Sequence, residues 1–448
     1  MTEPLVAEDV DSRSEARSSA HVSGRSVAAA PSGAVAHVAR RLGWGVIDQG
    51  VSSLGNFAMG LLVARSLGPE LFGAFTLAYV TYGVVLNASR GLATDPLLVR
   101  HSGAQTTEWR RAVAAATATA WLVGVVAGAV CLVVGLVLPH EVGWGFVALG
   151  VVLPGLMLQD SWRFAFFSVG RPVKAVVNDG VWALLQLAIL GALFATDTAS
   201  VATCILAFGG AGLASAALGL VQTRIRPRMS SAPRFVRANL DLGGRYLVEN
   251  LAISGARQVR FVLLGGIVSL GAVGEVRAAE MLMGPFLVIL MGMSQVAVPE
   301  AAHVLRAAPQ RLGRFCLAFG SLQALAAAVW GALMLVVLPW RLGDVLLGSL
   351  WHPAATLLPW VIAGMVAGGF EIGAAAGVRA LGAARRSLRA QLIYSFLYLT
   401  GGTMGAWLDG ARGTCIGVAI ATAIGAGLWW YQLQRARAEH AMKTAAPR

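Results

Sequence analysis

The sequence predicts an all-α polytopic membrane protein: about twelve transmembrane helices in two six-helix pseudo-repeats around a central cavity. The first observation is composition, because 57% of the 448 residues are hydrophobic and only 13% are charged, whereas roughly a quarter are charged in soluble domains. The second is that apolar runs recur along the whole chain, each near the ~20 residues that cross ~30 Å of hydrocarbon. These runs are continuous and not alternating, which disfavours a β-barrel. The third observation is an internal repeat.

The chain is expected to begin with a disordered cytoplasmic tail over residues 1–38. This segment is rich in Ser, Ala and mixed charge and lacks the apolar core of a signal peptide. The apolar runs that follow give the spans 43–66, 73–94, 111–138, 144–169, 174–195, 200–222, 243–269, 274–299, 314–338, 354–379, 387–408 and 412–434. Pro154 and Pro285 fall within spans and are expected to kink them.

The placement of arginine predicts the orientation. If the N-terminus is cytoplasmic, both tails and the even-numbered connections carry most of the arginine, whereas the opposite connections contain Arg341 as their one clear basic residue. Because basic residues concentrate in cytoplasmic loops, both termini are predicted to be cytoplasmic. The expected organisation is a six-helix lobe over 39–222, a basic cytoplasmic linker over 223–241, a second six-helix lobe over 242–434 and a cytoplasmic tail over 435–448.

The internal repeat relates the two halves of the chain. A shift of 201 residues lays "GWGVIDQGVSS" over "GRYLVENLAIS", and a nearby shift of 211 to 212 continues the match. The aligned pairs include Gly73 with Gly274, Asp160 with Glu371, and Gly170 with Gly382. They predict two six-helix halves of the same orientation, related by an axis along the membrane normal. Such halves usually enclose a central cavity and alternate its exposure by rocking against one another.

Composition and motifs exclude several classes of function. The net charge of +13 would suggest nucleic acid in a soluble protein, but in a membrane protein its placement matters more, and no nucleic-acid partner is predicted. No His/Asp/Glu cluster has metal-ligand spacing, and no P-loop or Gly-rich nucleotide fingerprint stands in a strand–helix context. We therefore expect no metal, no cofactor and no enzyme activity. The four cysteines each lie in an apolar run and are expected to be small core residues.

One short motif carries a family resemblance. The segment "LLVARSLGPELFGAFTLA", residues 61–78, contains an R-x-L-G-P-x-x-F-G pattern, here Arg65, Leu67, Gly68, Pro69, Phe72 and Gly73. It resembles the first helix–helix junction of bacterial polysaccharide flippases, which belong to the multidrug/oligosaccharidyl-lipid/polysaccharide exporter superfamily. With the twelve spans, the repeat and the "SVGRP" break, the resemblance covers about residues 40–435.

The resemblance implies a function in the bacterial cytoplasmic membrane. Such a protein moves an undecaprenyl-pyrophosphate-linked oligosaccharide, or a related lipid-linked glycan, from the inner to the outer leaflet for cell-surface polysaccharide biosynthesis. The implied partners are this substrate, membrane lipids, and polysaccharide polymerase or assembly proteins. Two alternatives remain: an ion-coupled multidrug antiporter of the same superfamily, and a non-transporting membrane scaffold. Arginines in the middle of spans disfavour both, because they repel cationic drugs and are costly without a transport role.

Three charges in the seventh span form the leading candidate site. At 100° per residue, Glu249 and Arg260 lie about 20° apart around the helix, and Arg257 lies about 60° from Arg260. Charges at this depth face a cavity or a partner. Our hypothesis is that Arg257 and Arg260 bind the pyrophosphate, which guanidinium forks suit geometrically. The alternative is that both are neutralised structurally, Arg260 by Glu249 or by acids on neighbouring helices.

Further acids within spans are candidates for ion coupling or charge pairing. Asp48 in the first span is either a proton or sodium site, as the resemblance to drug exporters implies, or a packing acid near the cytoplasmic rim. Asp160 and Arg163 are three residues apart in one helix and are expected to pair with each other. Asp179 and Glu371 are isolated acids that either relay protons or pair with arginines near the cytoplasmic side.

Charges near span ends complete the candidates. Arg90 either attracts an incoming phosphate or extends to the cytoplasmic surface. Arg65, in the last turn of the first span at the outer face, either anchors to headgroups and caps its helix or helps to receive the phosphate at the outer leaflet. Glu275, Arg277 and Glu280 open the eighth span and are expected to form a solvated first turn, a gate being the alternative.

Overall fold

The computed structural model describes residues 32–103, 105–338 and 342–445, and these form helices and the turns between them, with no strand. The chain divides into two compact units, residues 1–43 and residues 44–448, and all packing described below lies within the second. Most of the expected N-terminal tail, up to residue 31, lies outside the described residues, and so does Arg341. The side chains of Asp48 and Glu249 also lie outside the described part.

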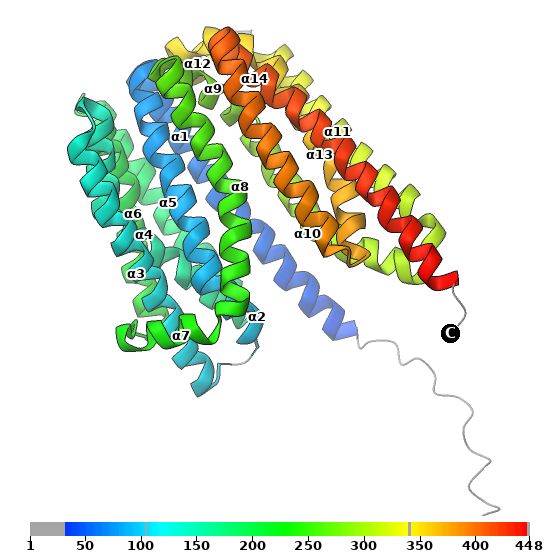
Figure 1. Ribbon diagram of the computed structural model, residues 1–448. Helices are drawn as coiled ribbons and strands as arrows, with labels where there is room; N and C mark the ends of the chain where they lie inside the picture. Colours follow the sequence, from blue (N-terminus) through cyan, green and yellow to red (C-terminus); the bar gives the residue numbers. More distant parts are fainter. Residues whose placement is uncertain (1–31, 104, 339–341, 446–448) are drawn as a thin grey trace, which may run out of the picture. The chain divides into compact units, whose positions relative to one another are not determined.

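The helices follow one another with short connections (Figure 1). The α-helices are α1 (Ser32–Ser89), α2 (Asp95–Arg100), α3 (Thr107–Val137), α4 (His140–Ser168), α5 (Pro172–Ala195), α6 (Val201–Thr223), α7 (Ala232–Ala238), α8 (Leu240–Ile267), α9 (Leu270–Leu282), α10 (Gly284–Ala307), α11 (Leu312–Val337), α12 (Gly343–Leu347), α13 (Trp351–Ala380) and α14 (Ala384–Ala445). A π-helical segment, η1 (Arg90–Thr94), joins α1 to α2, and the short 3-10 segments are η2 (Met229–Ser231), η3 (Pro309–Arg311) and η5 (Gly348–Leu350).

Eight helical segments of the described residues are long and apolar enough to cross a membrane. Two of them, Gly50–Arg100 and Arg385–Met442, each contain two helices separated by a sharp bend. The charged helix α8 and the consecutive helices α9 and α10 account for the remaining predicted spans. The expectation of an all-α membrane protein with about twelve transmembrane helices is therefore confirmed.

The two bends inside long helices occur at glycines. Gly68 has φ +75° and ends the first span of α1, after which Pro69 begins the second. In α14 the chain bends at Asp409 and Gly410, and Gly410 has φ +56°. Glycine adopts positive φ without a steric penalty. One expectation about bending is corrected: Pro285 does not kink a continuous helix, because α9 ends at Leu282 and α10 starts anew at Gly284.

The repeat is visible in the packing of its aligned glycines. A Cβ atom added at Gly73 would lie 1.8 Å from the carbonyl oxygen of Leu270, and one added at Gly274 would lie 2.2 Å from the carbonyl oxygen of Pro69. Two residues matched by the 201-residue shift thus meet at one helix crossing, as expected for equivalent residues close to a pseudo-twofold axis. We call residues 44–223 the N-terminal half and residues 240–445 the C-terminal half.

A second aligned pair shows the same backbone geometry. Gly170 and Gly382 follow the ends of α4 and α13, and both have φ +66°. Each donates its N–H to the carbonyl three residues earlier, that of Phe167 or of Arg379, at 3.0 Å. The two halves therefore repeat in local structure as well as in helix order.

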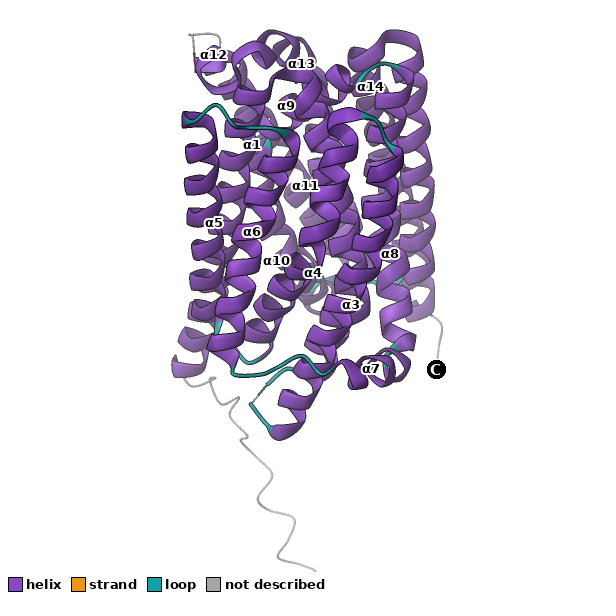
Figure 2. Cartoon of the chain, turned by 90° about the vertical axis from the view of Figure 1, so that its left-hand side faces the viewer, coloured by secondary structure: helices purple, strands orange, loops and turns teal. Residues whose placement is uncertain are grey.

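The bundle of helices has two distinct ends (Figure 2). Helix α7 lies at one end, which we call the basic end, and α12 lies at the other. At the basic end the two halves are joined by an ion pair between Arg100 Nη2 and Asp241 Oδ2 at 2.7 Å and by a hydrogen bond from Asn250 Nδ2 to Asp95 Oδ2 at 3.2 Å. These contacts tie the start of α8 to the N-terminal half.

The interior of the N-terminal half is filled by apolar and aromatic side chains. The rings of Tyr82 and Trp182 pack against Phe208 with centroids 5.2 and 5.1 Å apart, and Phe208 is fully buried. The four cysteines, Cys131, Cys204, Cys316 and Cys415, are all buried free thiols. Their expected role as small core residues is confirmed.

Candidate functional site

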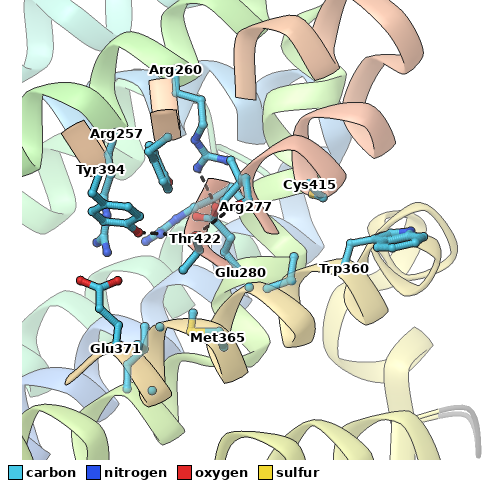
Figure 3. A pocket seen from close by; sticks show the side chains of 17 residues that line it. Arg257, Arg260, Arg277, Glu280, Trp360, Met365, Glu371, Tyr394, Cys415 and Thr422 are labelled. Carbon is cyan, nitrogen blue, oxygen red and sulfur yellow. Dashed lines mark hydrogen bonds and ion pairs between the residues drawn. The ribbon is translucent and has the colours of Figure 1, made fainter. Parts of the chain in front are cut away.

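A cavity of about 280 Å³ lies within the C-terminal half, and all 17 residues that line it belong to that half (Figure 3). They come from α8, α9, α10, α13 and the two segments of α14 that precede and follow its bend at Gly410. The repeat predicted a cavity between the halves, whereas this cavity lies inside one of them. Arg257, Arg277 and Glu371 of the C-terminal half line this space, whereas two interior arginines of the N-terminal half, Arg90 and Arg163, pair with Asp160 and Asp179.

Arg260 is the most deeply buried charge of the cavity wall. Its side chain is only 2% exposed, and its Nη2 lies 2.6 Å from Oε1 of Glu280. The guanidinium also stacks on the rings of Phe261 and Tyr398, at 4.4 and 5.4 Å from their centroids. A Cβ atom at Gly402 would lie 3.0 Å from Cδ of Arg260, so this glycine makes room for the arginine stem. The second alternative for Arg260, neutralisation by an acid on a neighbouring helix, is the one observed.

Arg260 and Glu280 neutralise each other, so the remaining positive charge of the cavity wall lies on Arg257 and Arg277. Both line the cavity, and Figure 3 shows them beside the Arg260–Glu280 pair. Neither forms an ion pair with any carboxylate among the described residues. Arg277 lies over the ring of Tyr79, 5.7 Å from its centroid, so this arginine also touches the N-terminal half. Two guanidinium groups are thus available to an anion in the cavity.

Glu371 adds a carboxylate on the opposite wall. It projects from α13 into the cavity beside Tyr394 (Figure 3), and no ion-pair partner for it occurs in the part of the chain that the structure describes. Tyr394 Oη lies 3.5 Å from Thr422 Oγ1. In total the wall carries three arginines against two glutamates, which leaves one excess positive charge.

Two ion pairs lie inside the N-terminal half, and of these the sequence offered only the pairing of Asp179 with an arginine, as one of two alternatives. Arg90 donates from Nη2 and Nε to Asp160 at 2.7 and 3.1 Å, and its guanidinium lies 5.1 Å from the centroid of Phe164. Arg163 Nε lies 3.3 Å from Asp179 Oδ2. The expected pairing of Asp160 with Arg163 is therefore wrong. Residues three apart differ by about 60° around a helix, and here they face different neighbours, η1 and α5.

The predicted site residues are only partly brought together. Arg257, Arg260 and Glu371 line the cavity, whereas Arg90, Asp160 and Asp179 belong to the ion pairs of the N-terminal half. Arg65 is exposed, at the end of the first span next to Gly348. Arg90 is 27% exposed, and its guanidinium pairs with Asp160 instead of extending freely to the surface as one alternative expected. The predicted roles of Asp48 and Glu249 fall on side chains outside the described part.

The sequence predicted the wrong environment for two residues of the cavity wall. Arg277 and Glu280 were expected in a solvated first turn, but they lie beside Arg260. The turn between α8 and α9 at Val268 and Ser269 explains why. Arg260 lies eight residues before this turn and Arg277 eight after it, so an antiparallel hairpin brings both to the same depth, about 12 Å from the turn. The equal distance of Arg260 and Arg277 from the turn is a sequence signal that could have predicted their proximity.

The fold was compared with known proteins. No protein-family model matches the chain, and no curated protein matches its sequence. Among solved structures, an inward-facing multidrug resistance MATE family transporter of the MOP superfamily has a TM-score of 0.66 at 14% identity, over 88% of this chain and 96% of the transporter. The lipid II flippase MurJ, in an inward closed conformation, has a TM-score of 0.67 at 10% identity, over 88% of this chain and 90% of MurJ.

The fold of this chain is similar to the folds of both proteins. An outward-facing MATE transporter matches with a TM-score of 0.57 at 15% identity, over 91% of this chain and 96% of the transporter. The solved structures that this fold resembles therefore include both inward-facing and outward-facing conformations. At these identities the likeness concerns the fold alone. The functional argument has to come from the residues of the cavity.

Proposed function

We propose that this protein is a flippase that moves an anionic lipid-linked glycan, of the undecaprenyl-pyrophosphate type, from the inner to the outer leaflet by alternating access. The observation that carries the proposal is the cavity wall, where Arg257 and Arg277 face open space without carboxylate partners among the described residues. Guanidinium groups bind phosphate oxygens through paired N–H donors. The lipid II flippase MurJ, which shares the fold, supports a lipid-linked substrate.

In this mechanism Arg257 and Arg277 bind the pyrophosphate while the isoprenoid chain stays in the bilayer. The ion pair between the buried Arg260 and the partly exposed Glu280 holds the hairpin of α8 and α9 so that Arg257 and Arg277 converge. Rocking of the two halves, the lobes 39–222 and 242–434 joined by the linker 223–241, then changes the side from which the cavity is reached. MATE transporters solved in inward-facing and outward-facing forms support this motion.

The proposal includes the cellular setting. We place the protein in the bacterial cytoplasmic membrane with both termini in the cytoplasm, so that the basic end receives the substrate. The excess of arginine in the connections of that end supports this orientation. A polysaccharide polymerase or assembly protein would take the product at the outer face.

The decisive experiment uses the Arg257→Gln variant in cells that lack the native gene. Loss of one charge-assisted contact is worth about 1.5–3 kcal/mol, so we expect transport to fall about ten- to hundredfold and the lipid-linked glycan to accumulate in the inner leaflet. The control is Arg389→Gln, which removes an exposed arginine outside the cavity wall. Normal glycan export by the Arg257→Gln variant at matched expression would contradict the proposal.

A second candidate is an ion-coupled multidrug antiporter, and the observation that favours it is Glu371. A carboxylate that lines the cavity without an ion-pair partner among the described residues could bind a cationic drug or a coupling ion. Several solved structures with this fold are multidrug MATE transporters. Deletion of the gene distinguishes the candidates: accumulated glycolipid supports the flippase, and raised drug sensitivity with unchanged glycolipids supports the antiporter.

A further inference from the structure

A second pocket, of about 390 Å³, lies at the basic end of the N-terminal half. It is formed by the first turns of α3 and by the segment that follows α6. Five of its lining residues are arginines: Arg110, Arg111, Arg224, Arg226 and Arg228. The pocket is separate from the transport cavity, since the two share no lining residue.

The pocket is held in shape by backbone contacts. The N–H of Arg228 donates to the carbonyl of Ala114 at 2.8 Å, and Arg110 Nη2 donates to the carbonyl of Arg224 at 3.1 Å. Ile225 between these arginines is buried, at 5% exposure. The connection between α6 and α7 is therefore fixed against α3, and the arginines are kept close together.

The arginine cluster has an unbalanced charge. None of the five arginines forms an ion pair with a carboxylate among the described residues. Glu108, the acid nearest in sequence, lies 4.0 Å from Nδ1 of His101 and is 83% exposed. Guanidinium groups this close repel each other, and an anion with several oxygen acceptors relieves the repulsion through charge-assisted hydrogen bonds.

An apolar stripe leads along α6 to this pocket. Leu213 and Val221 are 55% and 71% exposed, and Ala217 between them is also exposed. Residues four apart lie on one face of a helix, so the stripe runs along the membrane-facing surface and ends beside Arg224. Apolar surface that continues into a basic pocket matches the chemistry of a phospholipid. The acyl chains would contact the apolar stripe, and the phosphate headgroup would contact the arginines.

We propose that this pocket binds the phosphate headgroup of an anionic membrane phospholipid, whose acyl chains lie along the exposed face of α6. Basic pockets at the cytoplasmic membrane boundary are a recurrent form of lipid recognition. The bound lipid links α3 to the segment before α7, and through α7 it borders the start of α8. It thus stabilises the N-terminal half independently of the transported substrate.

The test uses the full-length protein in nanodiscs of phosphatidylcholine with or without phosphatidylglycerol and cardiolipin. The variant is Arg111→Gln with Arg226→Gln, because neither side chain makes a hydrogen bond within the part of the chain that the structure describes, so the fold should persist. The matched control is Arg385→Gln with Arg389→Gln, which removes two exposed arginines from the same end of the C-terminal half. Native mass spectrometry counts retained lipids, and thermal unfolding reports stabilisation.

We expect the wild type and the control to retain an anionic lipid and to melt at a higher temperature when it is present. The pocket variant should lose the stabilisation and bind the lipid at least about tenfold more weakly, while keeping the wild-type melting temperature in pure phosphatidylcholine. Equal retention by the pocket variant, or an equal loss in the control, overturns the proposal. Stabilisation by inorganic phosphate without any effect of anionic lipid overturns it as well, because the site would then bind a soluble anion.

Discussion

At the scale of single residues, the environment of each charge depends on contacts between helices. The sequence identified Arg257, Arg260 and Glu371 as charges of the membrane interior, and the structure places all three on one cavity wall. It did not identify the partner of Arg260, because Glu280 lies on another helix, 20 residues further along the chain. Spacing within one helix carries no information about such contacts. The Asp160–Arg163 expectation failed for the same reason.

The Arg260–Glu280 pair gives a prediction about stability. Breaking a buried ion pair by removing one partner costs about 3–5 kcal/mol, because the other charge is left uncompensated. Glu280 is 23% exposed and keeps Arg257 and Arg277 as positive neighbours, so we expect Arg260→Gln to lower the free energy of unfolding by less than this, about 1–3 kcal/mol. The double variant Arg260→Gln, Glu280→Gln should recover most of the loss, since neither charge remains.

The measurement is chemical or thermal unfolding in detergent, followed by tryptophan fluorescence. Arg257→Gln is the matched control, because Arg257 lies on the same helix without an ion-pair partner among the described residues, and it should alter stability little. A double variant no more stable than Arg260→Gln alone would show that the pair does not contribute as the structure indicates.

At the scale of elements, the motif between the first two spans has a structural role. Gly68 supplies the bend with positive φ, and Gly73 allows the second span to approach Leu270. The sequence alone predicts this junction and aligns Gly73 with Gly274. The alignment succeeded because this crossing is too close for a Cβ atom at either position, so both halves have glycine at the shared contact. Arg65, in the same motif, lies outside the cavity wall.

The close crossing of the second and eighth spans predicts that one added methyl group at Gly73 lowers the stability of the protein. In Gly73→Ala the new Cβ would lie 1.8 Å from a backbone carbonyl oxygen, so the helices must separate. Overpacking of this kind costs about 1–3 kcal/mol. The matched control is Gly83→Ala in the same helix, where no atom lies within 4 Å of the added Cβ and helix propensity favours alanine by about 0.5–1 kcal/mol. Comparing unfolding midpoints checks the prediction, and equal destabilisation by both variants would argue against this crossing.

At the scale of the whole molecule, the number, order and repeat of the helices were predictable, but the position of the cavity was not. Periodic apolar runs and aligned glycines are local signals, and they persist in each half. The position of a cavity depends on how side chains from several helices pack against each other, which no single segment of sequence specifies. In the N-terminal half Phe208 is buried among other rings, and Arg90 pairs with Asp160. In the C-terminal half, Arg257 and Glu371 border open space instead.

The contact between the halves at the end opposite the basic end predicts how transport can be blocked. The carbonyl oxygen of Arg65 lies 3.5 Å from the position of a Cβ at Gly348, so the N-terminal half touches the C-terminal half there. If the halves rock, this contact must open during each cycle. Cysteines introduced by Arg65→Cys and Ser349→Cys, joined by a short bismaleimide, should abolish transport without unfolding the protein. The four native cysteines are buried and should react slowly.

The control joins two positions within one half. Leu138→Cys and Glu141→Cys flank the turn between α3 and α4, and their crosslink should leave transport unchanged because that turn moves as one body. Reaction is followed by the mass of the crosslinked protein, and transport by the appearance of labelled lipid-linked glycan in the outer leaflet of proteoliposomes. If the crosslink between Arg65→Cys and Ser349→Cys leaves transport intact, this end of the molecule does not open, and rocking of the two halves is not the transport motion.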